Sequence, residues 1–223
     1  MKNKRRVLVL VDGYNLYHGL CDMQGDIPGD RNHAKWLDLK KLMLGFMNDT
    51  HHELVDVIYF TAYAKWRKKE FSRHRVYVRA LVHSGVKTVF GRFKEKPKKC
   101  KKCGSKFLKH EEKETDVNIA VEMFDAAHRD VFDDIYIVSA DTDLAGAIKR
   151  LKQDFKDKRV KVFMPPNRSN LEMRKVGHRY KVIKEHHILN ALFPKIVKPA
   201  FGKGPAIVRP TEYDPPDDDT LTE

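Results

Sequence analysis

The chain has 223 residues, with 44 Lys and Arg against 31 Asp and Glu, and therefore carries a formal net charge of +13. Hydrophobic residues make up 41% of it and charged residues 34%, which argues against wholesale disorder and indicates one globular domain with a heavily charged surface. No apolar run approaches the ~18 residues of a membrane span, and the first residues lack the pattern of a signal peptide. Three cysteines, two of them in one C-x-x-C, argue against a disulfide framework, so we expect a cytoplasmic protein.

The basic excess is distributed unevenly. The last ten residues hold five of the 31 acids and no base, so the rest of the chain carries a net charge of +18. The densest basic segment is 92–113, with ten Lys and Arg against three Glu. Lys and Arg bind phosphates by displacing counterions, which favours a nucleic-acid partner, although a solvated surface has the same composition.

Apolar runs alternate with helical patterns along most of the chain. The Val-rich run at 6–12 is typical of a strand buried on both faces. In chain order we predict a strand at 6–12, a helix at 36–47, a strand at 55–64, a helix at 69–85 closed by Gly85, a strand at 86–94, a helix at 115–132, a strand at 135–141, a helix through Ile148 and Leu151, and a strand at 159–166. In the helix at 115–132, the expected apolar stripe is Val117, Ala120, Val121 and Phe124.

This alternation predicts an α/β fold with a central, mainly parallel sheet flanked by helices, because parallel strands require crossover connections. Ligands of such sheets bind at the carboxyl ends of the strands, near a switch in strand order. Residues 1–195 are expected to form one domain, in which 97–112 is an inserted basic knuckle. Residues 196–223 are rich in Pro, Gly and Asp, so we expect a tail with little structure of its own.

Four aspartates fall where the predicted sheet would bring them together. Asp12 and Asp141 end two predicted strands, whereas Asp116 and Asp143 stand at helix starts. Ionised carboxylates at one site repel each other, so the arrangement calls for a cation or for shifted pKa values. Oxygen ligands select Mg²⁺ or Mn²⁺, and such an ion supports in-line hydrolysis of a phosphodiester.

Structural roles compete with this interpretation. Asp116 or Asp143 alone would most often be a helix cap, whereas capping does not explain an acid at the end of a buried strand such as Asp12. Gly13 would permit a tight turn or a close backbone approach. Asn15 would either orient a metal-bound water or hold the loop. Ser139 and Thr142 would either bond phosphate or the carboxylates, or form ordinary turn hydrogen bonds.

Three segments carry a family resemblance: VDGYNLY at 11–17, EKETDV at 112–117 and VSADTDL at 138–144. In this order they resemble the NYN domain, the LabA-like branch of the PIN-like nucleases, over residues 5–195. The resemblance implies a three-layer α/β/α PIN-like fold and a divalent-metal ribonuclease activity. It places metal-binding acids at Asp12, Asp116 and Asp141, with Asp143 as a fourth and Asn15 beside them. Members differ in whether they retain nuclease activity, and the presence of all four acids argues for an intact site.

Cys100 and Cys103 have the C-x-x-C spacing with which two thiolates share a zinc ion, and His110 would be a third ligand. A hairpin without metal is the main alternative. A redox pair is disfavoured because it would be expected at a helix start rather than in a Lys-rich loop. The neighbouring lysines are candidate contacts to the substrate backbone: Lys98, Lys99, Lys101 and Lys102.

Three further residues are candidates for substrate binding. Trp66 would stack on an unpaired base, with Arg67 beside it. Arg168 follows the fifth predicted strand and would either contact phosphate or belong to a solvated helix start.

The sequence thus favours an Mg²⁺- or Mn²⁺-dependent endoribonuclease acting on single-stranded RNA. The main alternative is an RNA- or DNA-binding regulatory module that uses the same basic surface without cleavage. A phosphatase that forms a phospho-aspartate is disfavoured because Tyr14 occupies the position of the second Asp. A Rossmann nucleotide site is disfavoured because no G-x-G-x-x-G follows the first strand.

Overall fold

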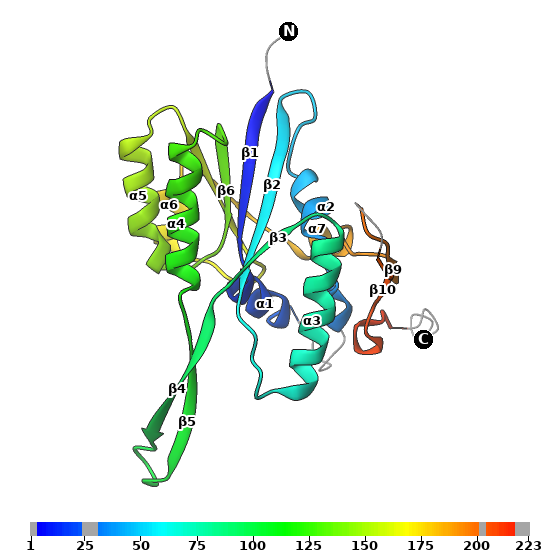
Figure 1. Ribbon diagram of the computed structural model, residues 1–223. Coiled ribbons are helices and arrows are strands. Elements are labelled where there is room, and N and C mark those ends of the chain that lie inside the picture. The colour runs from blue at the N-terminus through cyan, green and yellow to red at the C-terminus, as the bar shows by residue number, and fades with distance from the viewer. Residues whose placement is uncertain (1–3, 24–30, 201–203, 217–223) are drawn as a thin grey trace, which may run out of the picture.

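The apolar run near the N-terminus forms β1 (Arg5–Asp12), the buried centre of a six-stranded sheet. The computed structural model describes residues 4–23, 31–200 and 204–216 (Figure 1). Along β1 the side chains of Val7, Val9 and Val11 enter one hydrophobic core, and those of Leu8 and Leu10 enter the other. Since alternate side chains of a strand point to opposite faces, both faces of the sheet are covered here.

Every neighbouring pair of strands in this sheet is parallel, and the order is β3-β2-β1-β6-β7-β8. The other strands are β2 (His52–Thr61), β3 (Lys87–Phe90), β6 (Asp134–Val138), β7 (Arg159–Met164) and β8 (Arg179–Val182). The chain fills the sheet outward from β1 on one side and then from β6 on the other. The strand order therefore switches between β1 and β6, and a crevice is expected at the carboxyl ends of these two strands.

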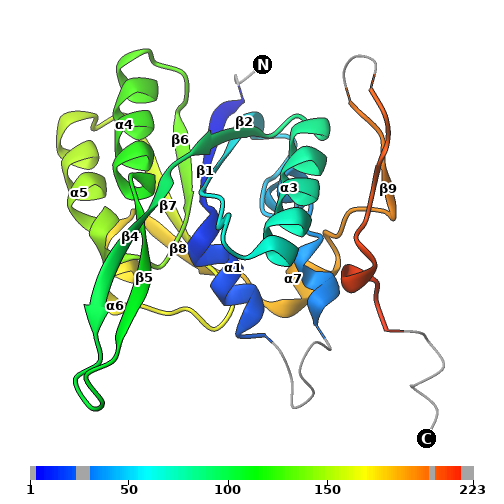
Figure 2. The ribbon, with the colours of Figure 1, turned by 60° about the horizontal axis from the view of Figure 1, so that its bottom comes forward.

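Helices cover both faces of the sheet (Figures 1 and 2). One face carries α1 (Gly13–Cys21), α2 (Leu39–Leu44), α3 (Lys68–His83) and α7 (Glu185–Leu189). The other carries α4 (Thr115–His128), α5 (Ala145–Asp154) and α6 (Leu171–Val176). Short 3₁₀ turns are η1 (Asn32–Lys35), η2 (Thr142–Leu144) and η3 (Thr211–Tyr213). The predicted three-layer α/β/α architecture is confirmed. Among the described helices, none combines the length and hydrophobicity that crossing a bilayer requires.

Two helices differ from their predicted form. The helix expected at 36–47 begins only at Leu39, because Asp38 caps it by accepting the backbone N–H of Lys41 at 3.1 Å. In α4 the expected stripe is wrong at Val117 and Val121, which are more than 60% exposed, whereas Phe124 packs against the core as predicted. The face that packs on the sheet consists instead of Ile119, Met123, Ala126 and Ala127.

The strand predicted at 86–94 is interrupted at Gly91, where the chain leaves the sheet. A Cβ atom at Gly91 would lie 2.7 Å from the carbonyl oxygen of Lys113 and 2.8 Å from Oγ1 of Thr115. The missing side chain therefore lets the outgoing and returning segments pass each other closely. Beyond this point β4 (Arg92–Lys99) and β5 (Lys106–Lys113) form an antiparallel pair, the β4–β5 ribbon, which projects from the carboxyl end of the sheet (Figure 1).

The C-terminal segment is more ordered than expected. β9 (Ile196–Val197) pairs with β10 (Ile207–Val208), and Tyr213 is only 9% exposed. These apolar side chains join the core on the α3 side, and Glu212 forms an ion pair with Arg73 of α3 at 2.9 Å. The expectation of a tail without structure is therefore wrong for residues 196–200 and 204–216. The acidic end at 217–223 lies outside the described residues.

Candidate active site and metal centre

Asp12 ends β1 with its side chain on the face covered by α4, in phase with Leu8 and Leu10. It is 4% exposed, and two donors hold its carboxylate: the backbone N–H of Asn15 to Oδ1 and the hydroxyl of Ser139 to Oδ2, both at 2.9 Å. Burial raises the pKa of Asp12 to about 7, against the lowering effect of these two hydrogen bonds. A proton or a cation would thus relieve the cost of this buried charge.

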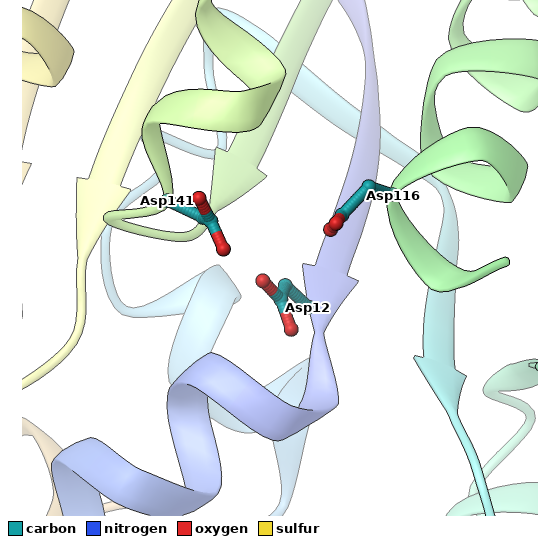
Figure 3. A group of neighbouring side chains, drawn as sticks. All are labelled: Asp12, Asp116 and Asp141. Atoms are coloured by element: carbon teal, nitrogen blue, oxygen red, sulfur yellow. The ribbon is translucent and has the colours of Figure 1, made fainter. Parts of the chain in front are cut away.

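Three carboxylates meet at the switch in strand order (Figure 3). Asp12 comes from the end of β1, Asp116 from the first turn of α4, and Asp141 from the loop after β6. Each offers an oxygen that lies within 4.8 Å of the others. Burial raises the pKa of Asp116, and the charges of Asp141 and Asp143 raise it further. The convergence predicted from the strand ends is therefore present.

The donor set fits a hard divalent cation. All three groups are carboxylates, the ligand type that Mg²⁺ and Mn²⁺ prefer, and few of them suffice because such ions retain water and substrate oxygens. Within the described residues, this is the only group of three His, Cys, Asp or Glu side chains with that proximity. The raised pKa values of Asp12 and Asp116 point the same way, since a cation would offset both the burial and the like charges.

Asp143 and Asn15 occupy different positions around this cluster. Asp143 is exposed and lies outside the group of three, but its charge reaches Asp116. Oδ1 of Asn15 accepts the backbone N–H of Ala140 at 3.0 Å. This hydrogen bond fits a role of Asn15 in holding the loop after β6.

Gly13 brings α1 close to the neighbouring strand. A Cβ atom at Gly13 would lie 2.5 Å from the ring of Tyr59 and 2.6 Å from the carbonyl oxygen of Phe60. The predicted close backbone approach is thus confirmed. It allows the helix to start directly after Asp12, whose side chain caps its first turn.

Glu112 was not singled out from the sequence, yet it lies beside the cluster. It is the penultimate residue of β5, is half-buried, and accepts a hydrogen bond from the hydroxyl of Thr115. Burial raises the pKa of Glu112, with a smaller contribution from the charge of Asp116, and the charge of Glu112 in turn raises the pKa of Asp12. Its sequence signal was its place as the first residue of the EKETDV segment, 112–117, that carries Asp116.

The ligand set proposed for zinc is not assembled. Cys100 and Cys103 lie at the tip of the β4–β5 ribbon, whereas His110 lies opposite Glu95, four residues along β5 from its start at Lys106. At strand spacing, four residues place His110 about 13 Å from Lys106, the first residue of β5 after the ribbon tip. His110 donates to Glu95 at 3.1 Å and stacks on Trp66, so the ribbon register directs it elsewhere. The hydroxyl of Ser105 contacts the Cys103 sulfur at 3.1 Å and lowers the pKa of that thiol to about 7.

The ring of Trp66 is occupied by contacts within the protein. Its centroid lies 3.6 Å from that of His110 with the rings nearly parallel, and the ring of Phe93 packs edge-on against it at 4.8 Å. Trp66 therefore anchors the ribbon to the segment before α3, although it is still 40% exposed. Arg67, the residue that precedes α3, is exposed next to it.

The remaining predicted substrate contacts lie on two separate parts of the surface. Lys98, Lys99, Lys101 and Lys102 are exposed at the tip of the ribbon. Glu111 lies within ion-pair distance of four ribbon lysines: Lys96, Lys98, Lys109 and Lys113. Arg168 forms an ion pair with Asp22 at 2.7 Å just past the end of α1, so its charge is matched within the protein.

Comparison with known proteins places the chain in a defined group. The family model of the NYN domain matches residues 6–183. Among solved structures, a protein of unknown function from Vibrio parahaemolyticus is similar, with a TM-score of 0.56 and 19% sequence identity over 86% of this chain and 99% of that chain. At this identity the likeness concerns the fold alone. The comparison with curated proteins gave no match.

Proposed function

Because this chain belongs to the NYN domain family, we propose that it is a divalent-metal-dependent nuclease that hydrolyses phosphodiester bonds within single-stranded RNA. The observation that carries the proposal is the meeting of Asp12, Asp116 and Asp141, with oxygens within 4.8 Å of one another, at the carboxyl ends of the central strands. The family and the three buried or half-buried acids together fit a metal-dependent nuclease. The proposal goes further in naming single-stranded RNA as the substrate and internal phosphodiester bonds as the sites of cleavage.

In this proposal Asp12, Asp116 and Asp141 hold Mg²⁺ or Mn²⁺, and Asp143 supports them from the exposed side. A cation at this place supplies positive charge for the phosphodiester and lowers the pKa of a water molecule. The protein's own part is to orient the carboxylates. Ser139 donates to Asp12, and Asn15 holds the loop that carries Asp141.

The basic surface supplies the substrate contacts. The exposed lysines at the ribbon tip, Lys98, Lys99, Lys101 and Lys102, together with Arg67, would bind the phosphate backbone through salt-dependent contacts. Trp66 would act by holding the ribbon in place. A zinc ion at Cys100 and Cys103 is no part of this proposal, since His110 is not brought to them.

We also propose a cytoplasmic location. All three cysteines, Cys21, Cys100 and Cys103, are free thiols, which is the usual state in a reducing compartment.

The test is a cleavage assay on labelled single- and double-stranded RNA and DNA with Mg²⁺ or Mn²⁺, and with EDTA. We expect single-stranded RNA to be cut internally and EDTA to stop the reaction. Asp12→Asn and Asp116→Asn should each lower the rate at least about 100-fold, because each removes a charged ligand of the proposed metal ion. Asp125→Asn is the matched control, since Asp125 is an exposed acid of the same helix as Asp116, paired with Arg129.

A second readout separates the two functions considered from the sequence. Asp12→Asn should still bind single-stranded RNA, and Mn²⁺ should raise the Tm of the wild type but not of this variant. Wild-type cleavage rates in Asp12→Asn would contradict the proposal. Salt-sensitive RNA binding by the wild type, with no metal-dependent cleavage of any of the four substrates, would instead identify a non-catalytic binding module.

A further inference from the structure

A large cavity lies between α1, α3 and the β4–β5 ribbon, and none of the three clustered aspartates is among the residues that line it. Its volume is about 820 Å³, at the upper end of the ~300–1,000 Å³ found for sites that enclose ligands of drug size. Gly13 and Tyr14, the two residues that follow Asp12, are part of its wall. A ligand in this cavity, here named the aromatic cavity, would therefore adjoin the proposed catalytic site.

Aromatic side chains from three elements line the aromatic cavity and are exposed. Tyr14 of α1 is 48% exposed and Phe107 of β5 is 50% exposed, while Trp66 from the segment before α3 is 40% exposed although His110 covers one face of its ring. Tyr17 adds a fourth ring at 41%. Solvated rings gathered in one concave site are typical of a binding surface rather than of a protein core. They favour a ligand with flat, unsaturated rings.

The charges around these rings favour an anionic ligand. Lys35, Arg67, Arg73 and Lys109 line the cavity together with two acids, Glu70 and Glu212. Glu212 is engaged by Arg73 at 2.9 Å. Aromatic faces combined with an excess of cations match a nucleic-acid strand, in which bases stack on rings and phosphates meet the cations.

Two polar side chains, Thr61 and His74, also line the cavity. Oγ1 of Thr61 and Nε2 of His74 lie 3.2 Å apart in a hydrogen bond, and both residues line the cavity. A few fixed polar groups among apolar side chains are the usual means by which such sites orient a ligand. The hydroxyl of Thr61 and the ring of His74 are thereby held in place at the cavity wall.

We propose that the aromatic cavity binds unpaired nucleobases of the strand whose backbone passes Asp12, so that the protein requires single-stranded substrate at the site of cleavage. This inference deepens the proposed function and rests on it for the chemistry. A base held in a duplex stack presents only its edges, so it cannot enter a cavity lined by ring faces. The β4–β5 ribbon, anchored by the contact of Trp66 with His110, forms the outer wall.

The test is an abasic scan. A fluorescent single-stranded RNA, with one abasic nucleotide placed at each position in turn, is titrated against full-length Asp12→Asn by anisotropy. We expect one or two neighbouring positions at which loss of the base weakens binding roughly 5- to 100-fold, the range of stacking on an aromatic side chain. The same oligonucleotides are given to the wild type with Mg²⁺ or Mn²⁺, and cleavage next to that position should fall by a similar factor.

Substitution of the cavity's aromatic residues then tests whether the base position found in the scan lies in the aromatic cavity. In Asp12→Asn proteins that also carry Tyr14→Ala or Phe107→Ala, the intact RNA should bind about as weakly as the abasic RNA, and the abasic RNA should lose little more. Both rings are about half exposed, so these variants keep the core intact. Tyr180→Ala is the matched control, because Tyr180 is 47% exposed on β8 and does not line the cavity.

The outcomes separate this inference from the proposed function. A scan in which no base affects binding, or equal affinity for a duplex of the same sequence, would overturn the cavity proposal while leaving cleavage by the wild type untouched. Base-dependent binding that Tyr14→Ala and Phe107→Ala leave unchanged would also overturn it. Failure of the wild type to cleave any nucleic acid would refute the nuclease, whereas the binding scan would still decide the cavity.

Discussion

The hydroxyl of Ser139 donates to Oδ2 of Asp12 over 2.9 Å and accepts the backbone N–H of Asp141 over 3.0 Å. One buried side chain therefore connects the carboxylate of Asp12 to the backbone of Asp141, so two of the three residues of the candidate metal centre are held together. Ser139 is fully buried, so neither bond can be replaced by solvent without rearrangement.

Ser139→Ala should lower cleavage about 10- to 100-fold with little change in KM, as expected when a group that orients a metal ligand is lost. Steady-state kinetics on single-stranded RNA measure this. Ser72→Ala, at an exposed serine of α3, should behave like the wild type. Equal kcat in Ser139→Ala and the wild type would show that Asp12 needs no such support.

Glu112→Gln should weaken Mn²⁺ binding about 3- to 10-fold, because it removes a negative charge that acts on Asp12 and Asp116 through a partly solvated medium. Isothermal titration calorimetry with Mn²⁺ measures the change. Glu111→Gln is the matched control, since Glu111 faces the ribbon lysines. The idea fails if both variants bind Mn²⁺ as the wild type does.

Gly13→Ala should destabilise the protein by about 1–3 kcal/mol, the usual cost of overpacking, because the new methyl group would collide with the backbone oxygen of Phe60 and the ring of Tyr59. Gly146→Ala in α5 should instead stabilise it by about 0.5–1 kcal/mol, since nothing lies within 4 Å of that position. Urea denaturation measures both. A stability loss of equal size in the two variants would contradict the steric explanation.

His74 should make stability fall in acid. Burial lowers the pKa of His74 from an ordinary value of 6.5 to about 4. Between these values the unfolded chain binds a proton that the folded protein does not, so the free energy of unfolding decreases as the pH falls from 6.5 to 4 and then levels off. The contribution is about 3 kcal/mol for a shift of this size.

Chemical denaturation of the wild type and His74→Gln across this pH range measures that contribution. The difference in unfolding free energy between the two proteins should change in favour of the variant as the pH is lowered. A constant difference from pH 7 to pH 4 would show that His74 takes up no proton on unfolding.

The sheet was largely predictable because its strands are apolar. The runs at 6–12, 55–64 and 135–141 became β1, β2 and β6, and the end of β1 located Asp12 correctly, whereas β6 ends at Val138 and leaves Asp141 in the loop that follows it. β8 was missed because Arg179, Tyr180 and Lys181 are exposed at the sheet edge and leave no apolar pattern.

Other features depend on tertiary contacts that no local pattern encodes. Helix α4 has apolar residues on more than one side, and only packing against the sheet selects Ile119 and Met123 over Val117 and Val121. The register of the β4–β5 ribbon separates His110 from the cysteines, and the return of its second strand brings Glu112 beside Asp12. Both facts follow from pairing across the hairpin rather than from spacing along the chain.

The closure of the ribbon at its base has an evolutionary consequence. Arg92 pairs with Lys113 where the hairpin leaves the sheet, and the N–H of Gly91 is held by the carbonyl oxygen of Thr61 at 2.8 Å. The two points of attachment are therefore fixed independently of the length and composition of the hairpin between them. Residues 94–109, between the ring contacts of Phe93 and His110 with Trp66, can therefore be lengthened, shortened or exchanged as a unit, so new substrate preferences can evolve while the positions of the three aspartates stay the same.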